Sequence, residues 1–164
     1  MELKDLKLPL SVVSQVDVAR LIRELDSLND FFASASRREA GSSVTPPRLS
    51  RSLNELAHDN QFNLLEQKHR EALSDLLNRT LKFSPALHIS FAAEPQPKFT
   101  DQILVWLRTN IHPQTLLQVG LQPTIAAGCV LRTPNKIFDM SLRSYLKQQE
   151  PYLTRLIAGA NNET

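Results

Sequence analysis

The chain has 164 residues, of which 41% are hydrophobic and 22% charged, and its formal net charge at pH 7 is +2. This composition is ordinary for a globular protein and leaves room for one domain, or for a helical region followed by a small domain. The charge is too small to indicate a nucleic-acid-binding protein by itself. Cys129 is the only cysteine, which excludes an intramolecular disulfide and a cysteine-based zinc cluster.

The N-terminal region alternates charged residues with leucine, and its longest apolar run covers only residues 8–13. Such a run is too short for the core of a signal peptide and far too short to cross a bilayer. We therefore expect any association with a membrane to be indirect.

The first predicted helix covers about residues 14–38. Ser14 and Asp17 have the spacing of a capping box, in which two side chains satisfy free N–H groups at a helix start. Apolar residues then recur at helical spacing on one face, at Val18, Leu21, Ile22, Leu25, Leu28 and Phe32. A loop rich in Ser and Pro is predicted at about residues 40–48.

A second long helix is predicted over about Leu49–Phe83, with Thr45 as its cap and Pro46 in its first turn. Leucines recur along it, and no residue type that usually ends a helix precedes Ser84 and Pro85. Two long helices joined by a short loop favour an antiparallel hairpin, so residues 1–84 are predicted to form a helical region. The hairpin is expected to pack through Leu21, Leu25, Leu28 and Phe32.

After Pro85 the pattern changes to short alternating segments typical of strands. The predicted order is strand 86–93, a helix from Phe99 to near His112, strand 116–121, strand 125–132, turn 133–136, a short strand 136–138 and a final helix. Asp139 or Ser141 is expected to cap the final helix, and Pro151 to kink or break it. The fold class is therefore α+β: an N-terminal long helical hairpin, a small mixed-sheet domain with two helices at 85–159, and a tail at 160–164.

The second half also contains a recognisable local sequence. Residues 122–128 read Gln-Pro-Thr-Ile-Ala-Ala-Gly, a turn follows at Pro134-Asn135, and residues 138–142 read Phe-Asp-Met-Ser-Leu. Over about residues 86–157 this resembles the C-terminal domain of the delta subunit of F-type ATP synthase, the oligomycin-sensitivity-conferring protein. That family has Asp-Pro-x-Leu-Ile-Gly-Gly and then Ile-Asp-Gly-Ser. The chain departs from the family at Gln122, Ala127 and Met140.

The resemblance implies a non-catalytic connector in the peripheral stalk of a rotary ATP synthase. Its implied partners are the b subunits of the stalk and the alpha subunits of the catalytic head. The implied location is cytoplasmic, peripheral at the cytoplasmic face of the plasma membrane, and no cofactor, nucleic acid or small-molecule substrate is implied. The family's N-terminal six-helix bundle has no obvious counterpart in residues 1–84, so its head-binding residues are not carried over.

The residues alone indicate no catalytic, cofactor or metal site. No Gly-rich phosphate loop is present, and the four histidines show no ligand spacing. Cys129 lies in an apolar segment and is predicted to be a buried, unreactive thiol. Two alternatives stay open beside the connector: an adaptor bound to nucleic acid through Arg37, Arg38, Arg48 and Arg51, or a helical adaptor with another partner. A Cys- or His-dependent enzyme is a third.

Two groups of residues are singled out in the second half. Pro123, Gly128, Asp139 and Ser141 are predicted to shape turns and caps rather than touch a ligand. Trp106, with Phe99 and Ile103, forms a stripe interpreted as sheet-covering core, with partner binding as the alternative. The final helix carries apolar residues that either pack on the sheet or meet a partner helix: Leu142, Tyr145 and Leu146.

Overall fold

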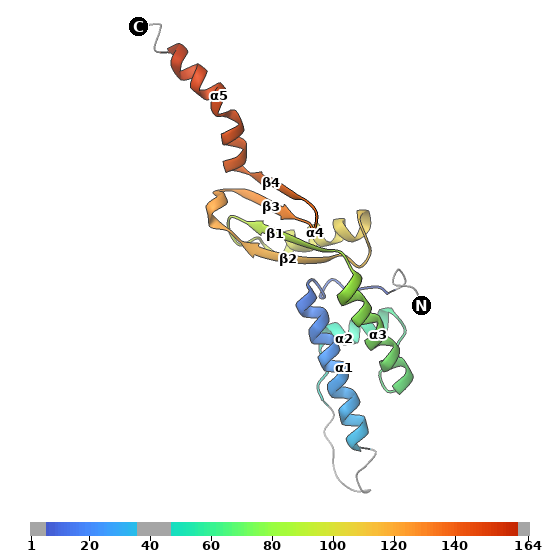
Figure 1. Cartoon of the computed structure of the whole chain (residues 1–164). Helices are drawn as coiled ribbons and strands as arrows, with labels where there is room; N and C mark the ends of the chain where they lie inside the picture. Colours follow the sequence, from blue (N-terminus) through green and yellow to red (C-terminus); the bar gives the residue numbers. More distant parts are fainter. Residues whose placement is uncertain (1–5, 36–46, 161–164) are drawn as a thin grey trace. The chain divides into compact units, whose positions relative to one another are not determined.

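The computed structural model describes residues 6–35 and 47–160 and has the predicted α+β class (Figure 1). Its elements are α1 (Gln15–Ala35), α2 (Arg51–Asp59), α3 (Gln67–Phe83), β1 (Ala86–Phe91), α4 (Pro97–Asn110), β2 (Leu116–Leu121), the 3-10 helix η2 (Pro123–Ile125), β3 (Gly128–Arg132), β4 (Ile137–Ser141) and α5 (Leu142–Ala160). Most of the predicted loop at 40–48 and of the tail at 160–164 lies outside the described residues.

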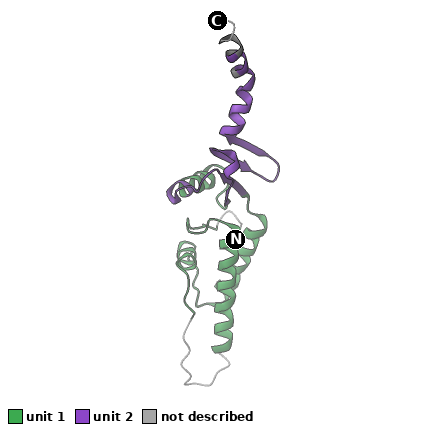
Figure 2. Ribbon diagram, turned by 90° about the vertical axis from the view of Figure 1, so that its left-hand side faces the viewer, with its two compact units in different colours: residues 1–86, 101–117 green, residues 87–100, 118–164 purple. Residues whose placement is uncertain are grey.

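The chain forms two compact units (Figure 2). Unit 1 consists of residues 1–86 and 101–117, and unit 2 of residues 87–100 and 118–164. Helix α4 and strand β2 each begin in one unit and end in the other.

The start of α1 is where the capping box predicts it. Asp17 accepts a hydrogen bond from the Ser14 N–H at 2.9 Å, and the Ser14 hydroxyl accepts one from the Asp17 N–H at 3.3 Å. The two side chains thus satisfy backbone donors that a helix start leaves free. The predicted end of this helix near residue 38 lies outside the described residues.

The prediction of one long helix over Leu49–Phe83 is wrong. The segment forms two helices, α2 and α3, which are separated by residues 60–66. At the end of α2, Gln61 has a φ of 58°, the Phe62 N–H donates to the Ala57 carbonyl at 2.8 Å and the Gln61 N–H donates to the His58 carbonyl. This pair of bonds is the Schellman motif, which usually has Gly in the left-handed position. With Gln there instead, the sequence carries no obvious stop signal. The start differs too: α2 begins at Arg51, and Ser50 caps it rather than Thr45.

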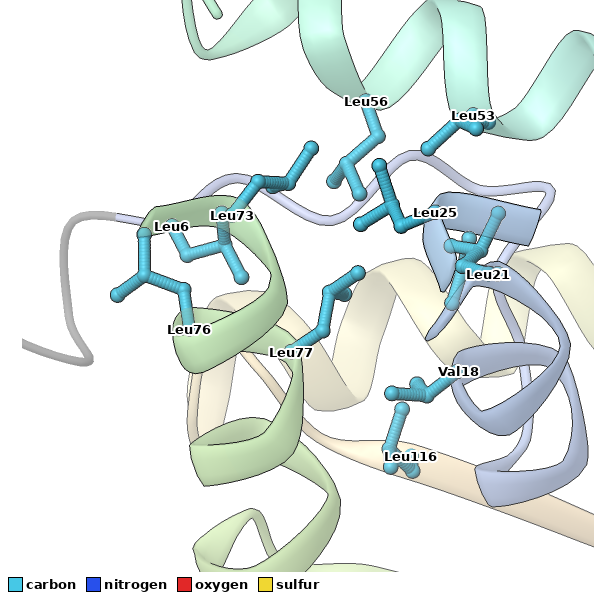
Figure 3. Packing of buried hydrophobic residues seen from close by; sticks show 11 residues of the cluster. Leu6, Val18, Leu21, Leu25, Leu53, Leu56, Leu73, Leu76, Leu77 and Leu116 are labelled. Atoms are coloured by element: carbon cyan, nitrogen blue, oxygen red, sulfur yellow. The ribbon is translucent and has the colours of Figure 1, made fainter. Parts of the chain in front are cut away.

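Unit 1 is held together by a cluster of buried aliphatic side chains (Figure 3). Three of the four predicted hairpin contacts, Leu21, Leu25 and Leu28, are buried on α1. Phe32 is only half-buried, and the Arg70 guanidinium lies 4.4 Å from the centre of its ring. Leucines of α2 and α3 fill the cluster together with residues outside the helices: Leu53, Leu56, Leu73, Leu76, Leu77, Leu6, Val12 and Leu116.

The segment before α1 is tied to unit 1 by Arg108 of α4. Its guanidinium donates hydrogen bonds to the carbonyl oxygens of Leu8 and Pro9, both at 3.0 Å, and to that of Val12. Burial lowers the pKa of Arg108 to about 10, so the side chain is still charged at neutral pH. Hydrogen bonds from a charged guanidinium to backbone carbonyls are stronger than those between neutral groups, and they order an otherwise irregular segment.

The sheet has four strands in the order β2-β1-β3-β4, with β1 and β3 antiparallel and β3 and β4 antiparallel. Ser90, Val130 and Asp139 are register partners across β1, β3 and β4, so their side chains share one face. The other face contains Phe91, whose ring meets that of Phe99 edge-on at 6.0 Å.

Several predicted boundaries in the second half differ from the structure. Strand 116–121 is confirmed as β2, whereas the strand predicted at 125–132 begins only at Gly128, because residues 123–125 form η2. The short return strand is longer than predicted and reaches Ser141. Of the kink or break predicted at Pro151, a break does not occur, since α5 continues through Pro151 to Ala160.

Candidate interaction surfaces

The turn and cap residues act as predicted at the start of α5. The Ser141 hydroxyl accepts a hydrogen bond from the Ser144 N–H at 3.1 Å, and Asp139 accepts one from the Ser141 N–H at 3.0 Å. Hydrogen bonds from Ser141, with a smaller effect of the nearby Arg143 charge, hold the pKa of Asp139 below its ordinary value. Ser141 is therefore the cap of α5, and Asp139 positions it. Pro123 occupies the start of η2.

The loop between η2 and β3 depends on two unusual backbone conformations. Gly128 has a φ of 86°, and a Cβ added there would lie 2.4 Å from the Met140 carbonyl oxygen. Ala126 has a φ of 64° and a ψ of −55°, and the Ala127 N–H donates to the Ile125 carbonyl at 2.8 Å. This bond closes a γ-turn centred on Ala126, a strained conformation for an L residue. Ala127, where the family has Gly, is not among the residues with positive φ.

Helix α5 exposes a row of large apolar residues. Leu142, Tyr145 and Leu146 are 45%, 59% and 49% exposed, so none of the three is buried on the sheet. Tyr152 and Ile157 continue the row at helical spacing and are also exposed. We call these five residues the α5 stripe. The edge strand β4 adds the exposed side chains of Ile137, Phe138 and Met140.

Trp106 is exposed rather than part of the core. Helix α4 buries Leu104 and Leu107, whereas Trp106 is 59% exposed, Phe99 is exposed and Ile103 is half-buried. The interpretation of the Phe99–Ile103–Trp106 stripe as core is therefore wrong. The buried positions three residues apart lie on a neighbouring face of the same helix.

A groove that sequence reasoning missed lies in unit 2. It has a volume of about 440 Å³ and is lined by η2, β3, β4 and the first two turns of α5. Its three cationic side chains, Arg132, Arg143 and Lys147, come from segments up to 15 residues apart in sequence. No short motif brings them together, so only the register of β3 on β4 could have indicated the site. We call these three residues the basic groove cations.

The remaining candidates do not assemble into a chemical site. Cys129 is half-buried, not fully buried as predicted, and burial raises the pKa of its thiol. Within residues 6–35 and 47–160, no three His, Cys, Asp or Glu side chains gather as a metal site. Of the loop arginines, Arg37 and Arg38 lie outside those residues, Arg51 pairs with Glu55 at 2.7 Å, and Arg48 lines a pocket with Arg20, Arg23 and Glu24.

Searches against family models and against curated proteins both found no match. In the described part of the chain, no helix is both long and apolar enough to cross a membrane.

Proposed function

We propose that the chain is a non-catalytic connector that binds a helical stalk through α5, as the delta subunit does in the peripheral stalk of F-type ATP synthase. The resemblance of residues 116–146 to that family supports the proposal. The Ser141 cap, which stands where the family has the Ser of Ile-Asp-Gly-Ser, supports it too. Under this proposal the partners are the b subunits of the stalk and the alpha subunits of the catalytic head.

The observation that carries the proposal is the exposed α5 stripe. An amphipathic helix normally buries its apolar side, and a large uncovered apolar row marks a site of association. The spacing of Leu142, Tyr145 and Leu146 places their side chains together on adjacent turns, the arrangement that receives another helix. Leu142 and Leu146 are already about half covered, so burying the rest of each against a partner contributes roughly half of the ~1.5–3 kcal/mol of full burial.

The mechanical role of a peripheral-stalk connector requires an apolar binding surface of this kind. A connector must hold the catalytic head still against the torque of the rotor, which requires slow dissociation rather than a reactive group. Interfaces that dissociate slowly are extended and apolar at their centre. The α5 stripe runs along a helix of 19 residues and offers such a centre.

The test places charge on the stripe. In the double variant Tyr145→Glu/Leu146→Glu the chain should fold, because both side chains are exposed, but it should no longer co-purify with the b subunits. Proton pumping by membranes should be lost while the released head still hydrolyses ATP. The control is Gln148→Glu, which adds one negative charge at an exposed position of the same helix outside the stripe and should change neither result. Unchanged co-purification and pumping in the double variant would contradict the proposal.

An adaptor bound to nucleic acid is the second candidate, favoured by the pocket that Arg20, Arg23 and Arg48 line in unit 1. No aromatic residue lines that pocket for stacking on a base, and Glu24 lies among the arginines. Binding of DNA or RNA that weakens steeply with salt, and that is lost on Arg20→Glu/Arg23→Glu, would favour this alternative over the connector.

A further inference from the structure

We infer that the groove containing the basic groove cations binds an acidic polypeptide segment of a partner. This surface adjoins the α5 stripe but shares no residue with it. Arg143 and Lys147 are four residues apart and share one face of α5. At about 100° per residue, the centre of that face lies about 100° around the helix from the centre of the face of Leu142 and Leu146, so the two faces adjoin. Because the two surfaces share no residue, the inference does not rest on the proposed function.

The fold builds the groove from the sheet, from α5 and from the η2 region. Arg132 pairs in register with Ile137, and Val130 with Asp139, so these four side chains point to one face of the sheet. Helix α5 adds Arg143, Ser144 and Lys147, and η2 with the residue before it adds Gln122, Thr124 and Ile125. The groove therefore combines apolar side chains with three cations and neutral hydrogen-bonding groups.

The charges in the groove are unbalanced. Asp139 is its only carboxylate, and that group already accepts the hydrogen bond from Ser141. Within the described part of the chain, none of the three basic groove cations forms an ion pair shorter than 4.0 Å. Cations gathered around a concave surface raise the local concentration of anions and steer them into it. The groove is thus complementary to a ligand that brings more than one negative charge.

The lining favours carboxylates on a polypeptide over a nucleic acid. No aromatic side chain lines the groove, so bases would have no stacking platform. Three cations beside the buried Ile125 and Val130 and the exposed Ile137 instead suit a segment that alternates Asp or Glu with small apolar residues. Lysine and arginine at the rim of an apolar patch raise association rates and select partners by charge.

The test uses the full chain and a synthetic hexaglutamate peptide, with hexaglutamine as the neutral control. In backbone amide spectra, hexaglutamate should shift the signals of β3, β4 and the first turns of α5, and hexaglutamine should not. Arg143→Glu/Lys147→Glu should weaken hexaglutamate binding about tenfold or more. The matched variant Lys136→Glu/Arg155→Glu changes the net charge equally at exposed positions outside the groove, and should weaken it less than about threefold.

Two outcomes would overturn the inference. One is that hexaglutamate shifts signals over both units alike, or that the two double variants weaken binding equally, since either result shows attraction without a site. The other is that inorganic phosphate at matched ionic strength binds the groove as tightly as the peptide does, which would make it a site for small anions. Thermal unfolding of both variants, expected to match the parent because the substituted side chains are exposed, confirms that they are folded.

Discussion

Gly128 and Met140 lie on neighbouring strands so close together that a Cβ on Gly128 would sit 2.4 Å from the Met140 carbonyl oxygen. The obstacle is backbone, which cannot rotate away, and the φ of 86° at Gly128 is unfavourable for any residue with a Cβ. Gly128 therefore allows β3 to pair with β4 at the point where the strand begins.

Gly128→Ala should destabilise the chain by roughly 3 kcal/mol, because backbone strain and overlap add. Denaturant unfolding measures the loss. Gly120→Ala is the matched control: its Cβ would meet the far end of the His88 side chain at 3.0 Å, and that side chain can move. An equal loss in both variants would show that the close approach to Met140 is not the cause.

Ala126→Gly should stabilise the chain by about 1 kcal/mol. The γ-turn at Ala126 is strained for alanine, and glycine relieves the strain at a smaller cost in unfolded-state entropy. At Ala127, which is not among the residues with positive φ, the same change brings only the entropic cost and should destabilise by about 0.5–1 kcal/mol. Thermal unfolding of the two variants should shift in opposite directions, and shifts of one sign would contradict the assignment.

Arg108→Lys should destabilise unit 1 by about 2 kcal/mol, since an ammonium has three donors on one atom and cannot reach the carbonyls of Thr115, Leu8, Pro9 and Val12 that the planar guanidinium spans. Hydrogen exchange should accelerate in the segment before α1 more than in α3. Arg79→Lys, an exposed position on α3, provides the comparison and should leave both measurements unchanged.

The cap of α5 should depend on pH through Asp139. Because the folded state holds the pKa of this carboxyl below its ordinary value, its contribution is present above about pH 3.9 and is lost as pH falls through the folded-state pKa. The difference in unfolding free energy between the parent and Asp139→Asn should therefore shrink from pH 7 toward pH 3. The exposed carboxylate of Asp101 gives a control in Asp101→Asn. A difference that stays constant over this range would contradict the role of the charge.

Cys129 should react slowly with thiol reagents at pH 7 in the folded chain and faster in urea. It is half-buried, and burial raises the pKa of the thiol, so little thiolate is present. By linkage, the folded state retains this proton longer, and stability should fall as pH rises above the ordinary thiol pKa of about 8.5. Rapid labelling of the folded chain at neutral pH would contradict the assignment of an unreactive thiol and would favour a cysteine-dependent enzyme.

The sequence by itself determined the features that depend on neighbouring residues. The capping box of Ser14 and Asp17, the strand at 116–121, a cap at Asp139 or Ser141 and the α+β class follow from local spacing and hydrogen-bonding capacity. Local rules failed where a residue adopts a conformation against its own preference. Gln61 ends α2 in a position that usually holds glycine, and Ala126 adopts the γ-turn that delays the start of β3.

Only the tertiary structure decided which surfaces are exposed and which charges meet. Helical spacing shows that Leu142, Tyr145 and Leu146 share a face, but whether a face is buried depends on what packs against it. Trp106 was assigned to the wrong side of α4 for the same reason, since the buried face is set by Leu104 and Leu107. Arg132 and Lys147 share a groove because β3 and β4 pair in one register and Ser141 starts α5 beside them. Such long-range pairing depends on the folded backbone, and no local sequence pattern encodes it.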